Sequence, residues 1–172
     1  MRSELVTAKP LRSQFVGRVQ QVPPERFRLA AAVYGILLDG DQVLLMRRTG
    51  SGYHDGELSL PAGHLDGGED ALSALLRELN EELVITVDRD TCEMVVVMHR
   101  PPESPGDHEY LDLFFTVDRW AGTPSIGEPD KCSELVWADR SSLPGDLVEY
   151  VRVALRAAAT DELLVLHDWT VS

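Results

Sequence analysis

Three glutamates close together in one amphipathic segment are the strongest chemical signal in the sequence. Glu78 lies three residues before Glu81 and four before Glu82, and residues with these separations are neighbours on a helix, where like charges repel. They would also lie near the C-terminal end of that helix, where the dipole disfavours negative charge. A divalent cation would reverse both penalties, because carboxylate oxygens suit Mg²⁺ or Mn²⁺. The pattern therefore indicates a metal site, with a solvated acidic helix face as the alternative.

The segment that carries these glutamates is predicted to form a helix from Asp70 to about Leu83. Its leucines recur at the spacing of one buried helix face, at positions 72, 75, 76, 79 and 83. The glycine pair at 67–68 ends any structure before it, and the acidic residues at 69–70 suit the N-terminal end of the helix dipole. This helix would hold the glutamates beside its apolar face.

Apolar segments rich in β-formers surround the predicted helix. Residues 27–48 are typical of two strands joined at an Asp39-Gly40 turn, and residues 50–68, rich in glycine, are expected to be mostly loop. Further strands are expected in 93–100, 109–120 and 133–139, and a second helix in 145–160. Residues 162–169 are expected either to add a final strand or to pack across the core. Strands and helices in this order predict a mixed α/β sandwich around one core.

Length, charge and cysteine content narrow the class of protein. The chain has 172 residues, 44% hydrophobic, with a formal net charge of -13, which predicts one domain and makes a duplex nucleic acid an unexpected partner. No apolar run is long enough to span a membrane and no signal peptide is evident. Two cysteines without a metal-binding spacing are typical of the reducing cytoplasm. Residues 1–26, with Pro23-Pro24, are expected to form an N-terminal arm before a domain at 27–172.

The complete spacing around the glutamates resembles the signature of a known enzyme family. Gly63, five residues, Glu69, seven residues and then the run from Arg77 to Glu82 resemble the Nudix box of the Nudix hydrolases. This resemblance implies a Nudix-type α/β/α sandwich with a mixed β-sheet. One position departs from the family pattern, because Val84 stands where the family has glycine. Valine is disfavoured in the left-handed conformation that glycine would adopt there, so the chain is expected to leave the helix by another route.

The resemblance also implies a role for each position of the box. Metal ligands would be Glu78 and Glu82, with Glu81 sharing a metal or taking a proton from water, and with the Gly63 carbonyl facing the metal. The cation implied is Mg²⁺, with Mn²⁺ as an alternative. The resemblance leaves the catalytic base open among Glu81, Glu82 and the loop residue Glu128. It implies a structural role for Glu69 and Arg77, with Arg77 pairing with Glu69 or Glu81.

The reaction implied by the resemblance is metal-dependent hydrolysis of a nucleoside diphosphate linked to a group X. The form expected first is a MutT-type (d)NTP pyrophosphohydrolase that releases a nucleoside monophosphate and pyrophosphate. ADP-ribose or a nucleotide sugar is the alternative substrate, and a non-catalytic nucleotide-sensing module is the alternative class. Arg47 and Arg48, after the second predicted strand, are candidates to bind phosphate or ribose. The partner expected is a small nucleotide, and a homodimer is a further expectation.

Overall fold

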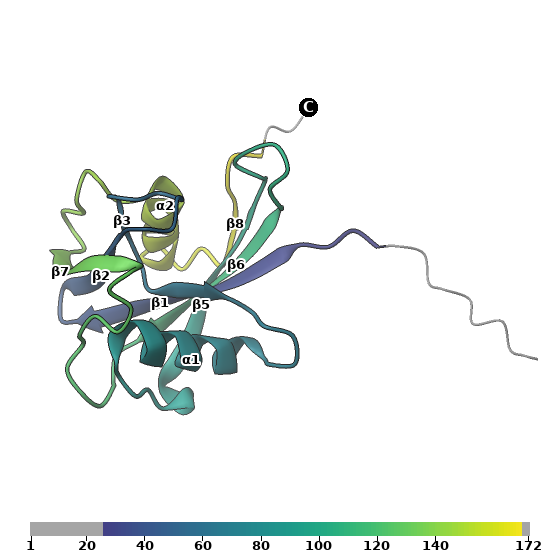
Figure 1. Ribbon diagram of the computed structural model, residues 1–172. Helices are drawn as coiled ribbons and strands as arrows, with labels where there is room; N and C mark the ends of the chain where they lie inside the picture. The colour runs from purple at the N-terminus through teal and green to yellow at the C-terminus, as the bar shows by residue number, and fades with distance from the viewer. Residues whose placement is uncertain (1–25, 170–172) are drawn as a thin grey trace, which may run out of the picture.

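A mixed β-sheet with one helix on each face forms the protein (Figure 1). The computed structural model describes residues 26–169. All but the last residue of the expected arm at 1–26 therefore lies outside the described residues, and the arm stays a prediction. The strands are β1 (Ala30–Asp39), β2 (Gln42–Arg48), β3 (Leu58–Ser59), β4 (Ala62–His64), β5 (Cys92–Arg100), β6 (Tyr110–Val117), β7 (Cys132–Asp139) and β8 (Leu164–Leu166). The helices are α1 (Ala71–Leu83), the short 3₁₀ helix η1 (Arg89–Thr91) and α2 (Glu149–Ala158).

The strand order explains why the sheet is mixed. Its main path runs β3-β2-β1-β6-β5-β8, with β4 added to β1 and β7 added to β2. The β1–β6 and β5–β8 pairs are parallel, and the other pairs are antiparallel. The predicted hairpin is confirmed, since Asp39 pairs with Gln42 across a turn at Gly40. The stretch at 50–68, expected to be mostly loop, also contains β3 and β4.

Alternation of side chains along β1 divides the core into two layers. Val33 and Leu37 belong to the cluster that packs on α1, whereas Tyr34 and Ile36 belong to the cluster that packs on α2. Successive residues of a strand point to opposite faces, so one strand serves both layers. Figure 1 shows α1 below the sheet and α2 above it. The α/β/α sandwich predicted from the sequence is therefore confirmed. Within residues 26–169, no helix combines the length and apolar character needed to cross a bilayer.

The acidic helix has the predicted extent and the predicted buried face. Asp70 is its N-cap, and the Asp70 carboxylate accepts hydrogen bonds from the N–H groups of residues 72 and 73. Leu75, Leu79 and Leu83 are buried on the side that faces the sheet. This face fixes the rotation of α1 about its axis, and so determines which glutamates point towards β4.

The expectation that Val84 would avoid the left-handed conformation is wrong. Val84 has φ 56° and ψ 35°, and its N–H donates to the Asn80 carbonyl as the C-cap of α1. Other contacts hold the helix end in place: the Asn80 amide donates to the Ile85 carbonyl, and backbone N–H groups of 125 and 127 donate to carbonyls of 83 and 82. The surrounding loop therefore imposes the backbone conformation that glycine would adopt without strain.

Candidate active site

A cleft of about 990 Å³ brings the acidic helix together with the sheet, with Tyr150 of α2 and with several loops. At one end it is lined by Glu78 and Glu82 of α1, by Gly63 of β4 and by the cationic side chains Arg48 and Lys131. At the other end, tyrosines and Arg100 form its wall. The cleft therefore has an end with mixed charges, suited to phosphate and metal ions, and an aromatic end.

Glu82 of α1 directs its carboxylate to the backbone of β4. Its side chain accepts a hydrogen bond of 2.9 Å from the Ala62 backbone N–H. Burial raises the pKa of Glu82 from 4.5 to about 8, and the charges of Glu78 and Glu128 add to this shift. No ion pair of Glu82 occurs among residues 26–169. A buried carboxylate without a cationic partner is a suitable ligand for a cation that enters the cleft.

Gly63 is required because β4 runs directly against α1. A Cβ atom at this position would lie 1.9 Å from both Cδ and Oε1 of Glu78. The strand pairing of Gly63 with Val33 fixes the backbone there, so a Cβ at this position would force the Glu78 carboxylate to move. The glycine of the box thus makes room for the Glu78 carboxylate, which is only 14% exposed.

Arg77 ties the loop before α1 to the carboxylates of the helix. Its guanidinium contacts Glu69 at 2.7 Å, Glu78 at 2.6 Å and Glu81 at 3.4 Å, and donates to the His64 carbonyl at 3.2 Å. The contact with Glu78 was not predicted, since Glu69 and Glu81 were the expected partners of Arg77. Glu81 is 48% exposed and does not line the cleft. Of the three glutamates predicted to bind metal, Glu78 and Glu82 therefore line the cleft and Glu81 does not.

Glu128 lies beside the end of α1, held there by backbone contacts of its loop. The Gly127 N–H donates to the Glu82 carbonyl at 2.8 Å, and a Cβ on Gly127 would fall 1.9 Å from the Glu81 carbonyl oxygen. The Glu128 carboxylate accepts from the Lys131 ammonium at 2.8 and 3.0 Å. Lys131 lines the cleft and was not singled out in the sequence, where nothing distinguishes it from other surface lysines.

The two arginines predicted to bind substrate have different surroundings. The Arg47 guanidinium contacts Glu134 at 2.8 Å and Asp146 at 2.7 Å and does not line the cleft. Arg48 lines the cleft and is held by the Tyr53 carbonyl and the Ser51 hydroxyl. Strand alternation places these neighbours on opposite faces of β2. Arg48 is therefore the better placed of the pair to meet a phosphate.

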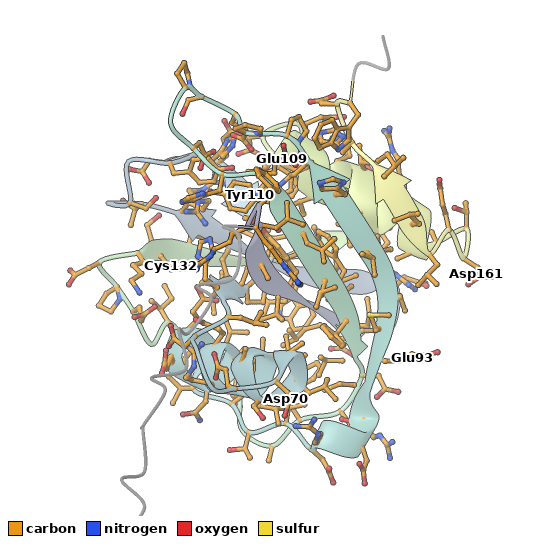
Figure 2. The ribbon with its side chains drawn as sticks, turned by 90° about the vertical axis from the view of Figure 1, so that its right-hand side faces the viewer. Asp70, Glu93, Glu109, Tyr110, Cys132 and Asp161 are labelled. Carbon is orange, nitrogen blue, oxygen red and sulfur yellow. The ribbon has the colours of Figure 1, made fainter. Side chains whose placement is uncertain are left out.

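The aromatic end of the cleft was not predicted. Arg100 is buried against Asp112, with Nε 2.6 Å from Oδ2, and its guanidinium lies over the rings of Tyr110 and Tyr150 at 4.1 and 4.2 Å. Figure 2 shows Tyr110 at the end of β6 that is remote from Glu93. The signal available was a charged residue, Asp112, within the apolar strand sequence YLDLFF, since a charge in such a strand is usually paired.

The residues of the box fit a divalent metal by their chemistry. Glu78, Glu82 and the Gly63 carbonyl supply the oxygen donors that Mg²⁺ and Mn²⁺ prefer, and Glu82 is buried without a cationic partner among the described residues. Within residues 26–169, no three carboxylate, histidine or cysteine side chains lie close enough together to hold a metal ion. Instead, the Arg77 guanidinium forms an ion pair with Glu78, and the Lys131 ammonium forms one with Glu128. A metal would replace these two cations as the charge partner of the carboxylates.

Comparisons with known sequences and structures agree on one family. The family model described as NUDIX domain matches residues 26–158. The chain is similar to the 8-oxo-dGTP diphosphatase of Escherichia coli (strain K12), with 29% identity over 119 residues that cover 68% of this chain and 88% of that protein.

Solved structures confirm the Nudix-type fold. A MutT NUDIX hydrolase from Burkholderia pseudomallei matches with a TM-score of 0.69 and 25% identity, covering 76% of this chain and 98% of the other. The NUDIX domain of Shewanella oneidensis NrtR, solved in complex with ADP ribose, matches with a TM-score of 0.63 and 17% identity, covering 82% and 93%. At 17% identity, the similarity to the NrtR domain concerns the fold alone.

Proposed function

Because the chain belongs to the Nudix family and is a Nudix hydrolase, as the box indicates, we propose that it hydrolyses a nucleoside diphosphate linked to a group X. The substrate we favour is a nucleoside triphosphate, cleaved to a monophosphate and pyrophosphate. The observation that carries this proposal is the pair Glu78 and Glu82 at one end of the cleft that also holds Arg48 and Lys131. The similarity to an 8-oxo-dGTP diphosphatase supports a triphosphate as substrate.

Glu78, Glu82 and the Gly63 carbonyl would hold Mg²⁺, with Mn²⁺ as the alternative. When bound, the cation neutralises the charge of the diphosphate bridge and orients it. Arg48 and Lys131 would bind phosphate oxygens from the other side of the same end of the cleft. Displacement at phosphorus depends mainly on positioning and on charge stabilisation, which these groups supply.

We propose that Glu128 is the general base that accepts a proton from the attacking water. Glu82 would serve as a metal ligand, and Glu81 pairs with Arg77 and does not line the cleft. Glu128 is close enough for its charge to raise the pKa of Glu82. On this assignment Lys131 leaves the Glu128 carboxylate and contacts the substrate, which frees the carboxylate to accept a proton. Glu128→Gln should then lower kcat more than Glu81→Gln does.

The test of the proposed function is a panel of nucleotides assayed with Mg²⁺ or Mn²⁺. We expect the wild-type protein to release pyrophosphate from at least one triphosphate, and Glu82→Gln or a chelator to reduce this rate at least about a hundredfold. Glu93→Gln is the matched control, because Glu93 is exposed at the far end of β5 (Figure 2). Turnover of ADP-ribose alone would support the alternative substrate, whereas binding without any turnover would contradict the enzyme and favour a sensing module.

A further inference from the structure

Two loops from different parts of the chain meet over the aromatic end of the cleft. One joins β2 to β3 and contributes Ser51 and Tyr53 to the lining, and the other joins β5 to β6 and contributes the residues from Glu103 to Asp107. No backbone hydrogen bond joins the two loops among the described residues. Any connection between them therefore depends on side chains.

Glu103 makes that connection. Its Oε1 accepts from the Tyr53 hydroxyl at 2.5 Å and from Arg100 Nη1 at 2.7 Å, and its Oε2 lies 3.0 Å from His54 Nε2. Burial raises the pKa of Tyr53, so the phenol keeps its proton and acts as the donor. A single carboxylate thus joins the two loops and also contacts the cation on the cleft wall.

The Arg100 side of this contact is rigid. The Arg100 side chain is 4% exposed, is paired with a fully buried Asp112 and is held between two tyrosine rings. The Glu103 side is different, because its loop has the sequence PPESPGDHE and Gly106 adopts a positive φ of 91°. Within this loop, the backbone N–H of Glu103 donates to Asp107 at 3.3 Å. Few buried contacts and an exposed backbone are features of segments that open locally.

From these contacts we propose that Glu103 is an autoinhibitory latch that closes the aromatic end of the cleft in the free protein. The nucleoside of a substrate must displace the Glu103 carboxylate from Tyr53, His54 and Arg100 before its base can lie against the tyrosines. Release of the loop also removes the carboxylate partner of Arg100 Nη1 and leaves the Tyr53 hydroxyl, at 3.3 Å, as its other contact. Nη1 is then a charged donor for an acceptor atom of the base. This inference rests on the proposed function, because the ligand that displaces Glu103 is the nucleotide substrate proposed for the cleft.

The first test measures nucleotide binding without metal, so that no turnover is needed. AMP and GMP are titrated calorimetrically into the wild-type protein, Glu103→Gln and Tyr53→Phe in the presence of chelator. If the open form makes up about a tenth of the free protein, removing the latch should raise the apparent affinity up to about tenfold. Glu109→Gln is the matched control, since Glu109 is the last residue of the same loop but contacts His99 and does not line the cleft.

A second measurement follows the loop without any ligand. Amide hydrogen exchange at residues 101–109 should be faster in Glu103→Gln and in Tyr53→Phe than in wild type, and unchanged in Glu109→Gln. Equal exchange in all four proteins would overturn the latch. Weaker nucleotide binding by Glu103→Gln would also overturn it, because Glu103 would then be part of the binding surface. If no nucleotide binds or is cleaved, the proposed function fails, while the exchange experiment still decides whether the loop is latched.

Discussion

At the scale of single residues, the buried Glu82 makes the metal-free protein sensitive to pH. The folded protein holds the Glu82 proton up to a pKa of about 8, whereas the unfolded chain loses it near 4.5. Because the folded state binds more protons between these values, the free energy of unfolding must fall as pH rises from about 4.5 to about 8. We expect a loss on the order of a few kcal/mol, measured by urea unfolding in the presence of a chelator.

Glu82→Gln provides the control for this pH dependence. An amide of nearly the same shape carries no charge to bury, so the variant should show a flatter pH profile in the same window and higher stability than wild type at pH 8. The same variant should lose activity, which is the exchange of stability for function expected at a strained site. A wild-type profile as flat as that of the variant would show that Glu82 is ionised in the folded state.

The second prediction at this scale concerns the space beside Glu78. Gly63→Ala introduces a Cβ that would lie 1.9 Å from Glu78 Cδ, so the carboxylate must move away from β4. We expect a loss of roughly 10- to 100-fold in metal affinity, measured by calorimetry with Mn²⁺. Gly67→Ala is the control, because a Cβ at Gly67 meets nothing within 4 Å. Equal losses in both variants would assign the effect to loop flexibility instead.

At the scale of elements, the end of α1 stores strain at Val84. The left-handed conformation costs a β-branched residue roughly 1–2 kcal/mol of conformational free energy, which glycine would not pay. Glycine also raises the entropy of the unfolded chain, and this offsets part of the gain in stability. Val84 is 55% exposed, so Val84→Gly gives up little buried surface. We therefore expect the variant to be more stable by up to about 1 kcal/mol, measured by thermal and urea unfolding.

The loop that contains Ile126 offers a control for the effect of introducing a glycine where there is no backbone strain to relieve. Ile126 is also β-branched and partly exposed, but it does not have a positive φ. Ile126→Gly should therefore be destabilising, because it adds backbone entropy to the unfolded chain without relieving strain. Destabilisation of the same size in Val84→Gly would mean that the contacts of the Val84 side chain outweigh its backbone strain.

Elements with a strong local pattern could be predicted from the sequence, and contacts between elements could not. The leucine spacing of α1 and the turn at Gly40 are local signals, and both predictions are confirmed. The β3 and β4 strands are only two and three residues long, and they exist because β2 and β1 pair with them. The fact that Glu82 lines the cleft, and Glu81 does not, depends on how β4 and the loops pack against α1, which spacing on a helix does not determine.

At the scale of the whole molecule, the aromatic end of the cleft needed the sheet topology to be recognised. Arg100 is on β5 and Asp112 is on β6. The pairing of these two strands makes them diagonal neighbours, and they form a buried ion pair. The Nudix box carried most of the information about family, but Arg100, Asp112 and the tyrosines that line the cleft lie outside it. Cytoplasmic location, the choice of nucleotide and a homodimer stay predictions, since nothing in the described part of the chain tests them.

Net charge gives a prediction that concerns the molecule as a whole. The formal charge of -13 should repel an anionic nucleotide before it reaches Arg48 and Lys131. Salt screens this long-range repulsion more than it screens short contacts in the cleft, so kcat/KM should rise between about 0.01 M and 0.15 M ionic strength at saturating metal. Steady-state assays with added KCl measure the effect.

Charge reversals remote from the cleft separate the field of the whole molecule from the local site. Glu93→Lys and Glu162→Lys change exposed residues that do not line the cleft. Together they should raise kcat/KM at low salt and reduce its dependence on salt, while leaving kcat unchanged, because the encounter alone is affected. A wild-type kcat/KM that falls with added salt would instead mean that Arg48 and Lys131 dominate the approach, and the two reversals would then have little effect.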